Sequence, residues 1–94
     1  MNIKPQRFPV CGVTPLVAPP GTMVTVEAID FGVPNKNVHV VLGDSLVAEG
    51  TLSSNGAVAV AFAIPEETKP GERLVTVGID GTALTADCTV VVEG

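Results

Sequence analysis

Short runs of alternating apolar and polar residues, separated by clusters of Gly, Pro, Asn and Asp, recur about every ten residues along this chain. In a β-strand successive side chains point to opposite faces, so each run predicts a strand with one buried face. Such regular spacing is typical of a sandwich or barrel, and we predict an all-β sandwich of seven strands. The predicted strands are 11–14, 23–29, 38–42, 46–49, 57–64, 73–79 and 82–92.

The composition supports a single core without helices. The chain has 94 residues, which is the length of one domain. Hydrophobic residues make up 46% and aromatic residues only 3%, so the interior must be built from Val, Ala, Leu and Ile with three Phe. We divide the chain into an extended N-terminal arm or linker at 1–10 and a sandwich domain at 11–94.

The strongest local signal is Asp80-Gly81, which stands between two alternating runs. This dipeptide is typical of a two-residue type I′ hairpin turn, where both central residues need positive φ. Such a turn pairs Val77 with Leu84 and Val75 with Ala86, and it sets which residues share the core face. The predicted core face of this hairpin comprises Val75, Val77, Ile79, Leu84, Ala86, Cys88 and Val90.

Two other strands show the same alternation. In 23–29, Val24 and Val26 point one way and the polar residues between them the other. In 57–64 every second residue is a larger apolar one, and the residues between are all alanine. The outward alanines make a shallow apolar surface, which is either lightly solvated or a contact surface for a partner sheet. They are Ala57, Ala59, Ala61 and Ala63.

Charge and hydropathy exclude two classes of partner. The net charge is −5 and the five basic residues form no run, so we expect no nucleic-acid binding. The mean hydropathy is +0.46, but no apolar stretch approaches the roughly 20 residues that a membrane-crossing helix needs. Residues 1–9 contain charges and two prolines where a signal peptide needs an apolar core. We therefore expect no secretion signal, although a piece cut from a longer secreted protein remains an alternative.

Several short motifs occur in a fixed order between Val10 and Val92, and together they resemble the IPT/TIG family of immunoglobulin-like domains. That family opens with Ile/Val-Ser/Thr-Pro and has Pro-Gly-Thr before its second strand, then an Asn-Phe-Gly-like corner. Near its sixth strand it shows Val-Pro followed by Pro-Gly. The matching segments are Val13-Thr14-Pro15, Pro20-Gly21-Thr22, Val24-Thr25-Val26, Asp30-Phe31-Gly32, Val38 through Gly43, Ile64-Pro65 and Lys69-Pro70-Gly71.

The resemblance implies an immunoglobulin-like, IPT/TIG-type, seven-stranded β-sandwich. Antibody-type and fibronectin-type topologies are the alternatives, but both usually carry a core Trp, which this chain lacks. The sequence departs from the family at Arg73, where an aromatic residue, often Tyr, is usual. In the family the first and last strands are neighbours, so the resemblance brings Cys11 and Cys88 within reach of each other. A disulfide and two buried free thiols both remain open.

No constellation for catalysis or metal binding emerges. His39 is the only histidine and alternates with two valines, which predicts a solvated outward position. A Ser-His-Asp triad would need Ser45, Ser53 or Ser54, and none of them lies in a nucleophile motif. Asp30 and Asp80 should lie at one pole of the sandwich, yet an Asp-x-Asp cluster for calcium is missing. We predict no enzyme activity, no metal and no cofactor.

We therefore expect a non-catalytic structural or interaction module. The first hypothesis is an accessory or decoration protein on the surface of a phage virion, attached to a capsid or other assembly subunit, with homo-oligomers allowed. In this hypothesis the arm is a strap that lays Ile3, Arg7 and Phe8 on a neighbouring subunit; in the alternative it is a plain linker.

Two further hypotheses remain. One is a spacer or binding module excised from a bacterial cell-surface or secreted protein, which would place the domain outside the cell. Sugar-binding platforms are usually Trp or Tyr faces, and the chain has neither, so the spacer version is favoured. The other, which the family resemblance implies, is a dimerising domain of a transcription factor.

Overall fold

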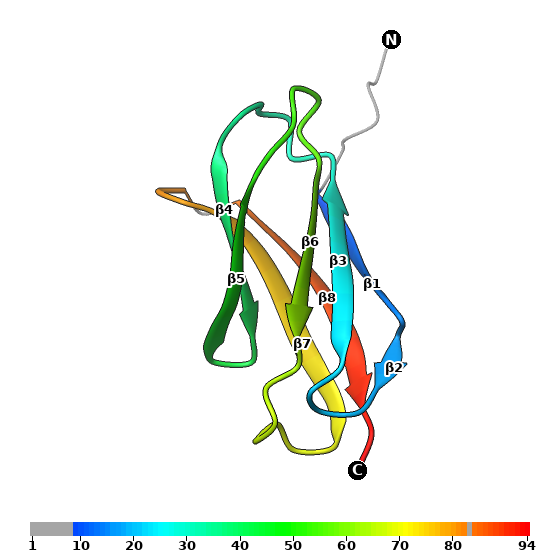
Figure 1. Ribbon diagram of the computed structural model, residues 1–94. Helices are drawn as coiled ribbons and strands as arrows, with labels where there is room; N and C mark the ends of the chain where they lie inside the picture. The colour runs from blue at the N-terminus through cyan, green and yellow to red at the C-terminus, as the bar shows by residue number, and fades with distance from the viewer. Residues whose placement is uncertain (1–8, 83) are drawn as a thin grey trace, which may run out of the picture.

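The computed structural model describes residues 9–82 and 84–94, and in this part of the chain all regular structure is β-strand. The strands form two sheets packed face to face as a β-sandwich (Figure 1). The strands are β1 (Val10–Thr14), β2 (Val17–Ala18), β3 (Met23–Ile29), β4 (Asn37–Leu42), β5 (Ser45–Thr51), β6 (Val58–Ala63), β7 (Gly71–Ile79) and β8 (Thr85–Val92).

The first sheet has three strands in the order β1-β3-β6, and the second has five in the order β2-β8-β7-β4-β5. Neighbouring strands are antiparallel, except that β2 runs parallel to β8. The expectation of an all-β sandwich is confirmed at this level. The described residues contain eight strands where seven were expected. The additional strand, β2, pairs only two residues with β8 and is too short to show an alternating pattern.

The predicted hairpin turn is wrong in its geometry. Of the two central residues only Gly81 has positive φ, at 78°, so the turn is not type I′. The ladder pairs Val77 with Ala86 and Val75 with Cys88, two residues away from the predicted register. The backbone N–H of Asp80 donates to the Asn37 carbonyl at 2.9 Å, which continues the pairing of β7 with β4. The turn itself is closed by bonds from the Thr82 N–H to the Ile79 carbonyl and from the Ile79 N–H to the Leu84 carbonyl, both at 3.1 Å.

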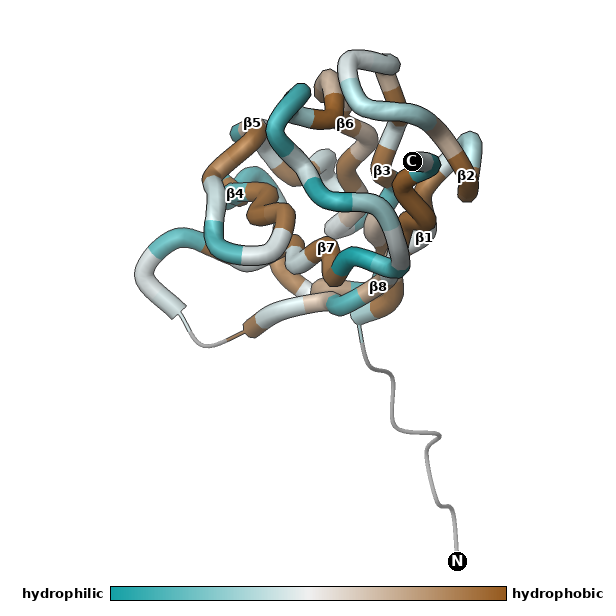
Figure 2. The backbone as a smooth tube through the Cα atoms, turned by 90° about the horizontal axis from the view of Figure 1, so that it is seen from below, coloured by the Kyte–Doolittle hydropathy of each residue, from teal (hydrophilic) through white to brown (hydrophobic). Residues whose placement is uncertain are grey.

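The predicted faces survive this shift because moving a register by two residues preserves side-chain parity. Val75, Val77 and Ile79 are completely buried. Ala86 on β8 is buried too, whereas Leu84 lies beyond the ladder and is exposed, against prediction. Seen from below, apolar segments occur on the strands of both layers, and much of the polar colour is on the loops (Figure 2). The fully buried large side chains are Leu52, Ile64, Ile79, Val24, Val26, Val38, Val40, Val75, Val77, Val90 and Val92.

At both lateral edges of the sandwich, a strand of one sheet lies close to a strand of the other. On one side β5 crosses β6 at Gly50, where a Cβ would lie 2.8 Å from a methyl carbon of Val60. On the other side, a disulfide joins Cys11 on β1 to Cys88 on β8. At the upper pole Phe31 is buried and donates its N–H to the Gly56 carbonyl at 3.4 Å. These contacts leave the outer faces of the sheets as the main accessible surfaces.

Candidate functional site

The residues singled out in the sequence fall in different parts of the molecule. Cys11 and Cys88 meet as a disulfide with a Cα–Cα distance of 5.5 Å, and this bond connects the two sheets. Ile3, Arg7 and Phe8 lie outside the described residues. The sandwich includes Val10, which pairs with Ile29, so β1 begins one residue before the expected domain boundary.

His39 is half-buried rather than freely solvated. Its Nδ1–H donates to the Asp80 carboxylate at 2.7 Å, and the two side chains are 37% and 55% exposed. The ring lies over Gly78, where a Cβ would be only 2.6 Å from Nε2. His39 is thus held between the β7–β8 loop and the glycine opposite it in the ladder. Sequence reasoning placed His39 on the outer face but missed both partners, because they lie about 40 residues further along the chain.

This pair does not extend into a catalytic constellation. A triad needs a hydroxyl on the second ring nitrogen, and here Nε2 faces a residue without a side chain. Ser53 hydrogen-bonds to Asn55 and to the backbone of Ala57 within the β5–β6 loop. Over residues 9–82 and 84–94, no three His, Cys, Asp or Glu side chains come together as a metal site.

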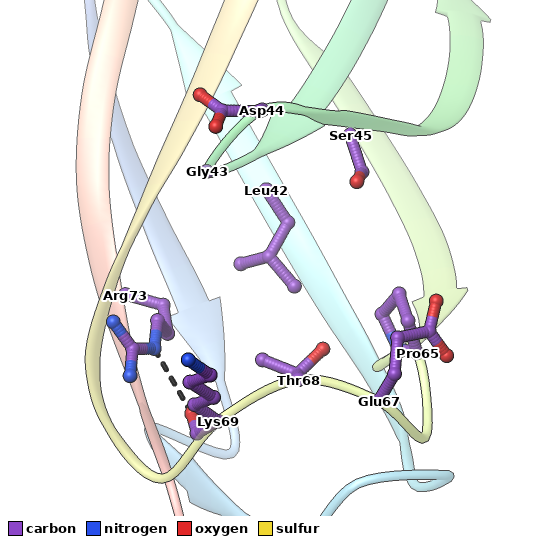
Figure 3. Close-up of a pocket in the computed structure, with 9 residues that line it drawn as sticks. All are labelled: Leu42, Gly43, Asp44, Ser45, Pro65, Glu67, Thr68, Lys69 and Arg73. Carbon is purple, nitrogen blue, oxygen red and sulfur yellow. Dashed lines mark hydrogen bonds between the residues drawn. The ribbon is translucent and has the colours of Figure 1, made fainter.

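A polar hollow of about 270 Å³ lies at the lower pole, between the β4–β5 turn and the loop that leads into β7. Figure 3 shows Leu42 pointing into this space from the side of the turn. The Arg73 guanidinium donates from Nε to the Lys69 carbonyl at 2.9 Å and from Nη2 to the Pro70 carbonyl at 2.8 Å. Two of its donors therefore order the loop that leads into β7. Asp44 and Glu67 line the same hollow, so its charge is mixed.

The most distinctive surface is the outer face of the three-stranded sheet, which we call the β1–β3–β6 face. Val10 and Ile29 pair at its upper end and are 51% and 47% exposed, and Met23 at its lower end is 58% exposed. Between them lie mostly glycine, alanine and threonine. The residues of this face are Val10, Gly12, Thr14, Met23, Thr25, Glu27, Ile29, Ala59, Ala61 and Ala63.

The alanine periodicity was the signal that pointed to this surface. Ala59, Ala61 and Ala63 are all exposed, as the alternation in 57–64 predicted. Ala57 precedes β6 and is partly buried, so it does not belong to the face. The contribution of β1 could not be predicted, because only strand pairing places Val10 and Gly12 beside β3.

No protein-family model matches the chain, and a search of curated proteins finds no match. The described part of the chain contains no helix that is long and apolar enough to span a bilayer. The fold and its surfaces thus define a two-sheet β-sandwich, and the proposal of function rests on its geometry.

Proposed function

We propose that this protein is a non-catalytic interaction module that contacts a protein partner through the β1–β3–β6 face. The observation that carries the proposal is the composition of that face. It presents three exposed large apolar side chains and one charged residue, Glu27, over a surface as long as the sheet. Exposed apolar surface of this kind marks interaction sites when it is contiguous.

We further propose that the sandwich is immunoglobulin-like and of the IPT/TIG type, as the sequence motifs imply. Immunoglobulin-like sandwiches often carry a Tyr at the start of the sixth strand that hydrogen-bonds back to the backbone. Arg73, near the start of β7, bonds to carbonyls three and four residues upstream. This supports the proposal because Arg73 makes a hydrogen-bonded contact to the upstream backbone like the one that the Tyr makes in those domains.

The described surfaces carry no convergent set of catalytic side chains, which favours an interaction module over an enzyme. The described residues include no buried polar or charged side chain. Catalytic groups usually occupy concave sites with several convergent polar side chains. In the described part of the chain, the second ring nitrogen of His39 lies over Gly78 and not beside a nucleophile. In the lower hollow, Arg73 donates to a backbone carbonyl of the loop. Hydrolytic turnover that disappears in His39→Ala would contradict this proposal.

The test uses Ala61→Arg, which places a long charged side chain midway along β6, an edge strand of the face, while leaving the core untouched. Thr85→Arg is the matched control, because Thr85 is exposed at the start of β8 on the other sheet. Tagged full-length protein is used as bait, and retained proteins are identified by mass spectrometry. A partner kept by wild type and Thr85→Arg but lost by Ala61→Arg supports the proposal. Equal retention by all three baits contradicts it.

The biological setting stays a prediction from the sequence. If the partner is a capsid or other virion subunit, the decoration-protein hypothesis gains support. If the partner is a neighbouring domain of the same polypeptide, the spacer hypothesis does. The same bait experiment therefore separates the two settings.

A further inference from the structure

The β1–β3–β6 face has a single charge at its middle. Glu27 is exposed on β3, and its cross-strand neighbours are Gly12 on β1 and Ala59 on β6. Neither neighbour has a side chain long enough to cover the carboxylate. A ligand that covers this face must therefore neutralise one negative charge and also contact the apolar residues at both ends.

A second copy packed face to face does not meet this requirement. In a two-fold symmetric contact the same patch is used by both subunits. Glu27 lies on the middle strand of the three-stranded sheet, so a two-fold axis through the centre of the face would bring two carboxylates close together. Like charges placed opposite each other destabilise a contact. An occupant with positive charge avoids this repulsion.

One segment of this chain has the required chemistry. Residues 1–8 contain two basic residues, Lys4 and Arg7, and three large apolar residues, Met1, Ile3 and Phe8, with no Asp or Glu. Subtracting their charge of +2 from the net charge of −5 leaves −7 on the residues that follow. The segment and the rest of the chain are thus complementary in charge.

We infer that residues 1–8 of one copy bind the β1–β3–β6 face of a second copy, and that two copies exchange these segments reciprocally. The inference rests on the proposed function, because it names the partner of the same face. Lys4 or Arg7 pairs with Glu27, and the apolar side chains of the segment contact Val10, Ile29 or Met23. Each copy donates one segment and receives one, which closes the assembly as a dimer.

Length and chain direction favour exchange over binding within one copy. Eight residues span at most about 28 Å, and the seven residues of β3 cover about 23 Å, so one segment can follow the whole face. The segment enters β1 at Pro9-Val10, at the upper end of its own sheet. A segment that covered its own face would have to run back antiparallel over β1, whereas binding to a second copy requires no such reversal.

The experiment measures self-association of the full chain by sedimentation at micromolar concentrations. Glu27→Lys reverses the charge of the face, and the double variant Lys4→Glu, Arg7→Glu reverses that of the segment. Each change is expected to raise the dimer dissociation constant by about tenfold or more. Glu72→Lys is the matched control, since Glu72 is exposed on β7 in the other sheet, and it should leave the dimer intact.

The decisive sample is an equimolar mixture of the two charge-reversed proteins. Each should be monomeric alone, while the mixture should form a heterodimer, because the face of each protein then meets a segment of opposite charge from the other protein. A monomeric wild type, a dimer insensitive to Glu27→Lys, or a mixture without heterodimer would overturn the inference. If wild type is monomeric but Ala61→Arg still loses another protein partner, the inference fails and the proposed function stands.

Discussion

The imidazole of His39 lies directly over Gly78, its partner across the β4–β7 ladder, so closely that a Cβ on Gly78 would be 2.6 Å from Nε2. Real Cβ atoms do not approach other atoms this closely. The ring is held in this position by its hydrogen bond to Asp80, so it cannot move away freely. Any side chain at position 78 would therefore displace the imidazole of His39.

Gly78→Ala is expected to destabilise the protein by about 1–3 kcal/mol, because the added methyl group displaces the imidazole and breaks its bond to Asp80. Chemical denaturation followed by circular dichroism measures the loss. Gly12→Ala is the control: a Cβ at Gly12 meets nothing within 4 Å, so this change should be neutral or slightly stabilising. Combining Gly78→Ala with His39→Ala should recover part of the loss, since the clash is then gone. Equal effects of the two glycine changes would contradict this account.

The Cys11–Cys88 disulfide should contribute strongly to stability because it closes a long loop. The sequence separation is 77 residues, for which the chain-entropy model gives roughly 4 kcal/mol. Replacing both cysteines by alanine should lower the unfolding midpoint by a corresponding amount. A reducing agent should lower the midpoint of wild type and leave that of the double variant unchanged. A wild-type midpoint insensitive to reduction would show that the bond is not formed or does not constrain the chain.

Arg73→Ala should cost about 1–3 kcal/mol, because two carbonyls lose a charged donor and the loop before β7 loses its anchor. Arg73→Lys should recover little, because an ammonium group cannot reproduce the planar fork that reaches both carbonyls. Arg73→Tyr should recover more than Arg73→Lys if this corner is equivalent to a tyrosine corner. Hydrogen exchange of the backbone amides of residues 66–69 reports the loop directly. Unchanged exchange in Arg73→Ala would contradict the anchoring role.

The assignment of residues to the inner and outer faces of the sheets can be tested with one kind of substitution, Val→Thr. Val26→Thr buries a hydroxyl at a completely buried position and should cost about 1–3 kcal/mol. Val17→Thr makes the same change at a half-exposed position on β2 and should stay within about 0.5 kcal/mol. Denaturant midpoints of the two variants give the comparison. A larger loss for Val17→Thr would contradict the assignment of faces.

Much of the β1–β3–β6 face could be predicted, and much of the His39 environment could not. The alternation in 57–64 identified the exposed alanines because the direction of side chains in a strand depends only on position along that strand. The Asp80-Gly81 turn failed for the opposite reason. Asp80 donates its backbone N–H to the Asn37 carbonyl and accepts a hydrogen bond from His39, and both partners belong to a strand about 40 residues earlier.

The strand content of the chain, and for most strands which residues are buried, can be predicted from local pattern alone, because the two-residue period of β-structure is local. The neighbours of each strand, the Cys11–Cys88 bond and the position of Gly12 beside Glu27 on an exposed face follow only from the folded arrangement. These relationships join residues far apart in the sequence. They depend on how the two sheets pack and pair, which no local pattern records.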